Sequence, residues 1–170
     1  MQGGLLGRIL SPLNWPKLAS LFYERSELAA DYYDELLVEK KTFGDILSSN
    51  SPLIAINATD IALGAQFTFH GYQFAPICSD LFSFPVSRAV TASSAVPGAF
   101  TSVIIENYAG SCDYEMPEWA ARALHEPYAT AHRYRHAKNL ETYMNARKFP
   151  YIHLLDGGLS DNLGIRPLTE

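Results

Sequence analysis

The chain has 170 residues and a formal net charge of −5, and it is 48% hydrophobic but only 18% charged. This length suits one domain, the hydrophobic content excludes intrinsic disorder, and the acidic balance leaves no basic footprint for nucleic acid. The two cysteines, Cys78 and Cys112, exclude a disulfide scaffold and leave the redox compartment open. The sequence has no apolar run of the roughly 18 residues that cross a bilayer. Its first residues also do not have the basic start and long apolar core of a signal peptide.

The first part of the chain predicts two helices. The clearer one covers residues 26–40, where Ser26 can cap the start and Leu28 begins an apolar face at helical spacing. Thr42 and Asp45, three residues apart, are typical of a capping box and predict a second helix start.

A strand and a hairpin are expected next. Residues 53–58, LIAINA, form a short apolar run that indicates a strand buried on both faces. Residues 67–69 and 72–74 alternate around His70-Gly71 and predict a hairpin.

The second half predicts further helices and a last strand. A helix of small residues begins at Val86 and stops at Pro97-Gly98. Helices are also expected over 117–124 and 137–146, and a strand over 151–155. This order of elements favours an α/β or mixed-sheet domain.

The strongest signal for chemistry is Asp156-Gly157-Gly158, directly after that last strand. A carboxylate at a strand end points into the crevice where open α/β sheets place their sites, and glycines permit a tight turn and a close approach. An ordinary turn explains the same tripeptide, because Asp and Gly dominate turns. Both interpretations stay open on this motif alone.

Three segments taken in order resemble the patatin-like phospholipase family: 57–60 (NATD), 92–100 (ASSAVPGAF) and 156–164 (DGGLSDNLG). The helix before 42–45 also resembles the segment that the family carries after its nucleophile. The similarity extends from Leu28 to Ile165 and is weakest over 106–150. It implies a three-layer α/β/α sandwich with a central mixed sheet, present only in part as one partial domain over 1–170.

The resemblance implies a serine lipid acyl hydrolase of the phospholipase A or esterase type. Such an enzyme uses a Ser-Asp dyad without histidine, and its general base maps onto Asp156, with Gly157 and Gly158 shaping the loop. The implied substrate is a phospholipid or another acyl ester, and neither a metal nor an organic cofactor is implied. A serine hydroxyl needs such an adjacent base to become a good nucleophile.

Two parts of the family's machinery are not found in the sequence. It contains no G-x-S-x-G nucleophile elbow and no Gly-rich loop that could supply oxyanion donors. The family carries both upstream of the matched segments, so we interpret the chain as the middle of a domain. We expect the intact protein to be an esterase and this chain alone to be inactive. The alternative is a non-catalytic lipid- or partner-binding remnant, either a pseudoenzyme or one half of a split enzyme.

Other polar residues are expected to be structural. Ser93 and Ser94 lie in a helical run rather than on an elbow, and Ser160 is too close to Asp156 in sequence to act independently. Asn57 and Asp60 suit side-chain bonds to the backbone after their strand. The pair 161–162 favours a helix cap.

Three histidines, His125, His132 and His136, fall in a basic segment. The last two share a helix face, but the residues between them, 133–135, supply no carboxylate, which excludes an H-E-x-x-H zinc site. Basic and aromatic residues mix here as on a surface that contacts anionic lipid, and a solvated insertion explains the same pattern. Peripheral membrane contact is thus one expectation for the following residues: Arg122, Tyr128, Arg133, Tyr134, Arg135, Lys138, Tyr143, Arg147 and Lys148.

Overall fold

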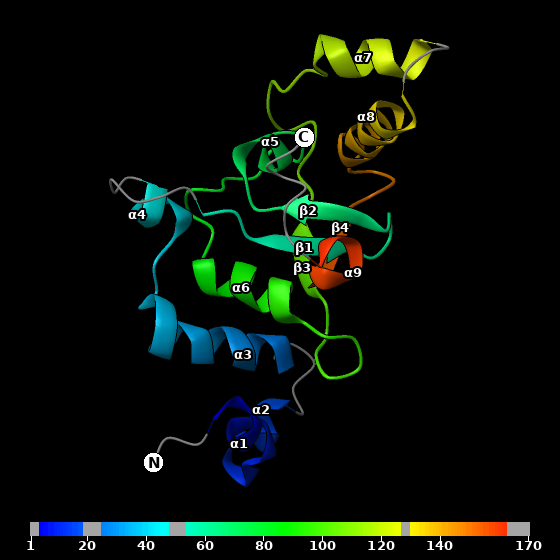
Figure 1. The fold of residues 1–170 in the computed structure, drawn as a ribbon. Helices are drawn as coiled ribbons and strands as arrows, with labels where there is room; N and C mark the ends of the chain where they lie inside the picture. The colour runs from blue at the N-terminus through cyan, green and yellow to red at the C-terminus, as the bar shows by residue number, and fades with distance from the viewer. Residues whose placement is uncertain (1–3, 19–24, 48–53, 127–129, 163–170) are drawn as a thin grey trace.

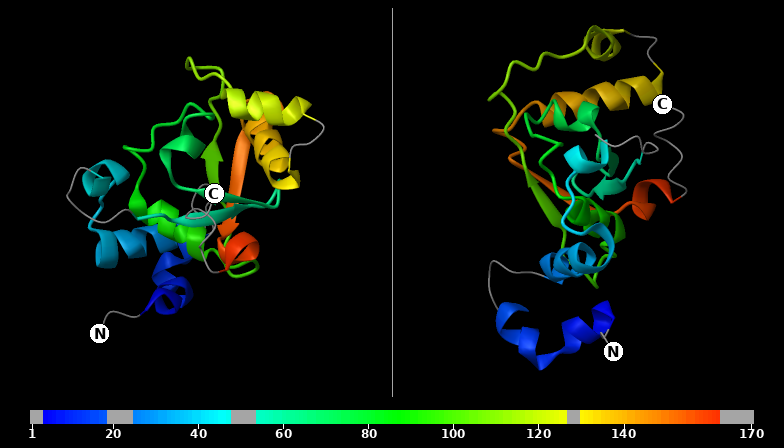
Figure 2. Two further views of the ribbon diagram at one scale, coloured as in Figure 1. Left: turned by 45° about the horizontal axis from the view of Figure 1, so that its top comes forward. Right: turned by 90° about the vertical axis from the view of Figure 1, so that its left-hand side faces the viewer.

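The computed structural model describes residues 4–18, 25–47, 54–126 and 130–162. Helices and a four-stranded sheet alternate along these ranges, which agrees with the expected α/β class. Figures 1 and 2 show the helix α6 between the sheet and the helix α3, with α1 and α2 at one end of the molecule and α7 and α8 at the other.

The sheet has the strand order β2-β1-β4-β3. Its strands are β1 (Asn57–Asp60), β2 (Ala65–Thr68), β3 (Val103–Glu106) and β4 (Tyr151–Asp156). β1 is antiparallel to both β2 and β4, and β3 is antiparallel to β4. The described strands therefore form an antiparallel sheet, whereas the resemblance implies a mixed one.

The strand predictions are confirmed at β4 and in part at β1. β1 begins at Asn57, later than predicted, and Ala58 to Asp60 are buried in succession, as expected of a strand covered on both faces. Residue 53 lies outside the described ranges. β3 was not predicted.

The hairpin expected around His70-Gly71 is wrong. β2 pairs with β1 instead, and residues after it form the short helix α5 (Gly71–Phe74), whose start His70 caps by accepting the Tyr72 N–H. Phe67, Phe69 and Phe74 pack together in one core cluster of rings rather than on two paired strands, whereas Tyr72 is exposed. The rings of this cluster include Phe43, Phe67, Phe69, Phe74 and Phe84.

The N-terminal helices pack below α6 in Figure 1. They are α1 (Leu5–Leu10), a 3-10 turn (Pro12–Asn14), α2 (Trp15–Leu18) and α3 (Arg25–Tyr33), which continues into a π-helical turn (Asp34–Val38). The helix predicted over 26–40 is confirmed as far as Val38, whereas Glu39 and Lys40 have positive φ angles of 49° and 58° and lie outside it. Ser26 does not cap it: Ser26 lies inside α3, where its buried hydroxyl donates to the Thr101 carbonyl.

The capping box before α4 (Phe43–Leu47) is confirmed. The Thr42 N–H donates to Asp45 Oδ2 at 2.8 Å, and the Asp45 N–H donates back to Thr42 Oγ1 at 3.4 Å. The Thr42 hydroxyl also donates to Asp45 Oδ2, at 3.0 Å. The bonds that the Thr42 N–H and hydroxyl donate to the carboxylate lower the pKa of Asp45.

The predicted helix of small residues is α6 (Val86–Ser94). Ala89 and Ala92 are fully buried, so their small side chains let the helix lie close to the sheet. An ion pair between Arg88 and Glu27, 3.4 Å apart, joins α6 to α3.

Two helices and a disulfide complete the fold. α7 (Glu118–His125) agrees with its prediction, whereas α8 (Ala131–Tyr143) begins before the predicted 137. The two helices pack against each other through a small core of their own. A disulfide joins Cys78 to Cys112, two residues whose pairing the sequence left open.

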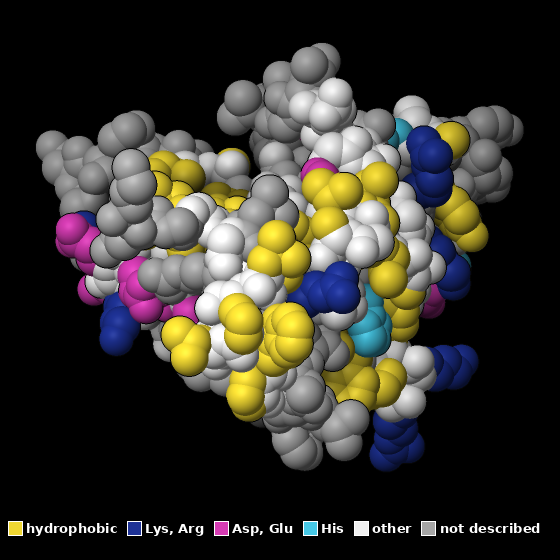
Figure 3. Space-filling view, turned by 90° about the horizontal axis from the view of Figure 1, so that it is seen from below, with side chains coloured by type: hydrophobic (Ala, Val, Ile, Leu, Met, Phe, Trp, Pro, Cys, Tyr) yellow, Lys and Arg dark blue, Asp and Glu magenta, His cyan; other side chains and the backbone are white. Residues whose placement is uncertain are grey.

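The end of the molecule that carries α1 and α2 exposes hydrophobic side chains. Figure 3 looks at this end and shows hydrophobic side chains spread over it. Leu10, Leu13 and Trp15 are 73%, 87% and 62% exposed. A search of the described helices finds none that is both long and apolar enough to cross a membrane.

Candidate active site

The site begins where β4 ends, at Asp156. The strand places Asp156 opposite Ala58 of β1, and alternation along β4 puts it on the same face as the buried Ile152 and Leu154. The Asp156 N–H donates to the Ala95 carbonyl at 3.1 Å, just past the end of α6. The strand and the helix therefore fix the backbone that carries the carboxylate.

Gly157 makes the next turn possible. A Cβ atom at this position would lie 2.5 Å from the backbone oxygen of Asn57, closer than side chains approach in proteins. Its N–H donates to the Ser93 carbonyl at 3.2 Å. Only glycine therefore fits between β1 and α6 here without a shift of backbone.

The Asp156 carboxylate is held but not enclosed. The Gly158 N–H donates to Asp156 Oδ1 at 2.8 Å, at the start of the short helix α9 (Gly158–Asp161). The side chain is partly exposed, and no further hydrogen bond to this carboxylate comes from the part of the chain that the structure describes. One carboxylate oxygen is thus available to accept a proton from a group brought to it.

A hydroxyl network supports the turn from the β1 side. The Thr59 hydroxyl donates to the Asp156 carbonyl at 2.8 Å and lies 2.8 Å from the Ser160 hydroxyl. The Ser160 hydroxyl also bonds the Gly157 carbonyl at 3.4 Å. Thr59 was not singled out from the sequence, although it lies in the 57–60 segment that carries the resemblance.

The structure brings together the three segments that carry the resemblance. β1 is the first segment, the end of α6 and the residues after it form the second, and the described part of the third, residues 156–162, lies at the end of β4 and in the turn after it. β1 pairs with β4, α6 packs on β1, and the N–H groups of Asp156 and Gly157 donate to the carbonyls of Ala95 and Ser93.

The serines of these segments have structural partners. Ser94 Oγ donates to the Val90 carbonyl at 2.9 Å and lies 3.3 Å from the Tyr33 hydroxyl. Ser93 contributes its carbonyl to the Gly157 turn, and Ser160 bonds to Thr59. These contacts agree with the structural roles predicted for all three.

Asp60 and Asn57 behave differently from each other. Asp60 Oδ1 accepts the Ala62 N–H at 2.9 Å, as predicted, but Oδ2 also accepts the Tyr143 hydroxyl at 2.9 Å in the buried core. Burial raises the pKa of Asp60, and burial beside this carboxylate raises the pKa of Tyr143. Asn57 Oδ1 is buried and finds no donor among the described residues.

Not every residue of the predicted basic and aromatic segment lies on the surface. The prediction that Tyr143 contacts a membrane surface is wrong, because its side chain is buried and its hydroxyl donates to Asp60. Tyr128 lies outside the described ranges.

His132 and His136 lie on one face of α8, with ring centroids 6.4 Å apart. Among the described residues, no three His, Cys, Asp or Glu side chains are grouped as metal ligands.

Comparisons of the chain with family models, with curated proteins and with solved structures found no match.

Proposed function

We propose that this chain is the base-bearing part of a patatin-like serine acyl hydrolase, with Asp156 as the general base. The observation that carries the proposal is the convergence of 57–60, 92–100 and 156–158 at one place in the fold. The resemblance selected these segments by their order in the chain, and their meeting around one available carboxylate supports it. In this proposal the described sheet and α6 belong to the larger three-layer α/β/α sandwich.

The local geometry is suited to a general base. A base must be held at a fixed position within hydrogen-bond reach of the hydroxyl that it deprotonates. Asp156 is fixed through its N–H, its carbonyl and one carboxylate oxygen. The other oxygen remains for the nucleophile.

The reaction proceeds through an acyl-serine. Asp156 takes the serine proton as the hydroxyl oxygen attacks the ester carbonyl carbon, whose π electrons move onto the carbonyl oxygen. The intermediate collapses with cleavage of the bond to the alcohol, which leaves with the proton from Asp156. Water then attacks the acyl-serine, Asp156 accepts its proton and returns it to the serine, and the carboxylic acid is released.

The nucleophile belongs to residues that the 170-residue sequence does not contain. Among the described residues, the hydroxyls of Ser94 and Ser160 bond to groups other than the Asp156 carboxylate, and Ser93 contributes its carbonyl to the Gly157 turn. The substrate is a phospholipid or a simpler acyl ester.

Two measurements test this proposal. The coding sequence immediately upstream of Met1 should encode a Gly-rich loop followed by a G-x-S-x-G elbow. The chain alone should release no p-nitrophenol from p-nitrophenyl butyrate above the buffer rate. An upstream region without a serine elbow, or esterase activity in the isolated chain, contradicts the proposal.

A second candidate function is non-catalytic lipid or partner binding. The observation that favours it is the exposed apolar group Leu10, Leu13 and Trp15, since large exposed apolar patches mark interaction surfaces. Binding to anionic phospholipid vesicles without cleavage supports this function, and Leu13→Ser should then weaken the binding. Vesicle binding that is unchanged in Leu13→Ser argues against it.

A further inference from the structure

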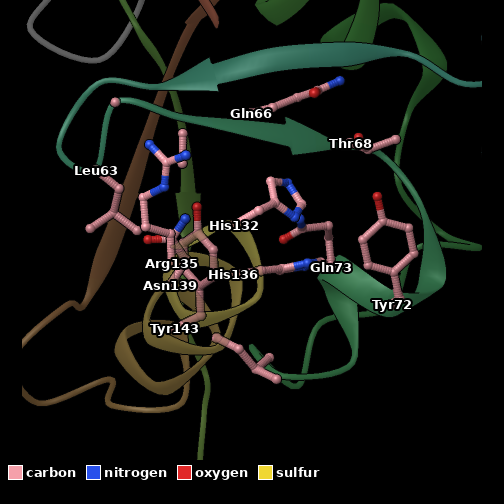
Figure 4. Close-up of a pocket in the computed structure, with 13 residues that line it drawn as sticks. Leu63, Gln66, Thr68, Tyr72, Gln73, His132, Arg135, His136, Asn139 and Tyr143 are labelled. Carbon is pink, nitrogen blue, oxygen red and sulfur yellow. The ribbon is translucent and has the colours of Figure 1, made fainter. Parts of the chain in front are cut away.

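A polar hollow lies away from the Asp156 turn, between the β1–β2 hairpin, α5 and α8. Its volume is about 440 Å³, which is within the range of roughly 300–1,000 Å³ typical of ligand pockets. Figure 4 shows Arg135 and His132 extending from α8 toward the hairpin, with Gln73 and Tyr72 facing them from α5.

The wall formed by α8 presents one arginine, two imidazoles and one amide to the hollow. His132, Arg135, His136 and Asn139 all line the hollow, and their spacing of i, i+3, i+4 and i+7 puts them on one helix face. None of the lining residues in the described part of the chain is an aspartate or a glutamate. Arg135 is the one formally charged side chain among the described lining residues, so the hollow can offer an anion a positive partner in a chain that is acidic overall.

Two side chains that line the hollow are held in place by contacts within the chain. The His136 ring lies against Trp119 of α7, with centroids 5.2 Å apart. Tyr143 also lines the hollow, and its hydroxyl is committed to the buried Asp60. Asp60 itself does not line the hollow.

We propose that this hollow binds a phosphate group. The Arg135 guanidinium can bind two phosphate oxygens in a fork, and Gln73 and Tyr72 line the opposite wall from α5. A tetrahedral phosphate accepts from several directions, whereas a carboxylate has only two oxygens in one plane. The proposal goes beyond the acyl hydrolase function and does not depend on it.

The phosphate could be free or part of a lipid headgroup, and the probes separate these sources. The ¹⁵N-labelled chain is titrated with inorganic phosphate, and separately with glycerophosphocholine, at an ionic strength kept constant with chloride. We expect saturable NMR shifts in α8 and α5 with at least one probe. Saturation with inorganic phosphate alone identifies a free phosphate site, and saturation with glycerophosphocholine identifies a headgroup site.

Two arginines on one helix provide a matched control. Arg135 lines the hollow, whereas Arg133 is exposed on α8 and does not line it. Arg135→Gln should weaken binding by about tenfold or more, the usual effect of losing one charged hydrogen bond, and Arg133→Gln should change it less than about twofold. Equal weakening in both variants, or shifts that never saturate in the parent chain, overturns the proposal.

A variant on the opposite wall provides an independent check. Gln73→Glu introduces a carboxylate from α5 and should abolish the saturable shifts, while circular dichroism confirms that the helices remain. Retained phosphate affinity in a folded Gln73→Glu chain also overturns the proposal. Neither measurement involves ester hydrolysis, so failure here and failure of the acyl hydrolase proposal are distinguishable.

Discussion

Replacing Gly157 with alanine tests the geometry of the candidate active site. The new Cβ atom would lie 2.5 Å from the Asn57 backbone oxygen and 3.1 Å from its carbonyl carbon. Neither contact is with a flexible side chain, so rotation of a side chain cannot relieve it. The turn after β4 must move away from β1, and with it the N–H that Gly157 donates to Ser93.

The expected cost follows from this clash. Real Cβ contacts essentially never fall below 3.0 Å, so the two backbones must separate by at least 0.5 Å (3.0 − 2.5). Overpacking of this kind lowers the free energy of unfolding by about 1–3 kcal/mol. In a chain of this size, 1 kcal/mol corresponds to about 2–4 °C, so the melting temperature should fall by roughly 2–12 °C.

Thermal unfolding followed by circular dichroism measures this change, and Gly71→Ala is the control. Gly71 is the first residue of α5, and a Cβ there would meet nothing within 4 Å. Its replacement should leave the melting temperature unchanged or raise it slightly, because alanine restricts the unfolded chain. A Gly157→Ala chain as stable as Gly71→Ala would refute the close approach of β1 and the turn.

Three further predictions concern stability. Tyr143→Phe removes the hydroxyl donated to Asp60 and should lower the free energy of urea unfolding by about 1–3 kcal/mol at pH 7. The loss of unfolding free energy should shrink as pH falls through the raised pKa of Asp60, because the protonated carboxyl is less costly to bury. A loss that does not depend on pH contradicts this prediction. The Asp45 carboxylate, whose pKa is lowered, should stabilise the fold above its ordinary pKa of 3.8 and lose that effect as pH falls through the lowered value. Asp45→Asn should abolish this part of the pH dependence, and an unchanged acid-unfolding curve opposes the capping box. Reducing the disulfide, whose cysteines are 34 residues apart, should cost about 3–4 kcal/mol by loop entropy. The melting temperature should then fall by roughly 6–16 °C, whereas an unchanged melt with reductant argues against the pairing.

The elements that the sequence predicted have local signals. Thr42 and Asp45 form their capping box within four residues, and α6 has small side chains at helical spacing and ends at Ser94, shortly before Pro97-Gly98. β4 is an apolar run followed by a glycine turn. In each case the neighbours in sequence supply the interactions that define the element.

The features that the sequence did not predict depend on distant partners. β3 has only four residues, and its alternation of buried and exposed side chains becomes evident only beside β4. The aromatic residues between Phe67 and Phe74 alternate as in a hairpin, but the phenylalanine rings pack against rings from other elements of the fold. The bond between Tyr143 and Asp60 joins residues 83 positions apart.

The candidate site shows both situations. Asp156, Gly157 and Gly158 could be selected from their position after a strand and from the family resemblance. The contribution of Thr59 could not, because a hydroxyl that supports the Asp156 carbonyl is recognisable only once β1 and β4 are paired. The hollow beside α8 likewise required α5 and the hairpin to be placed around the histidines.

The central claim is that Asp156 is the base of a serine acyl hydrolase. The most direct test is the esterase rate of the chain extended by its upstream coding sequence, compared with Asp156→Asn and with Asp113→Asn, which changes an exposed carboxylate elsewhere. If Asp156 is the base, Asp156→Asn lowers kcat by about 10²–10⁴-fold, the usual contribution of a general base, and Asp113→Asn leaves kcat unchanged. An extended chain that keeps its full rate without the Asp156 carboxylate shows that Asp156 is not the base.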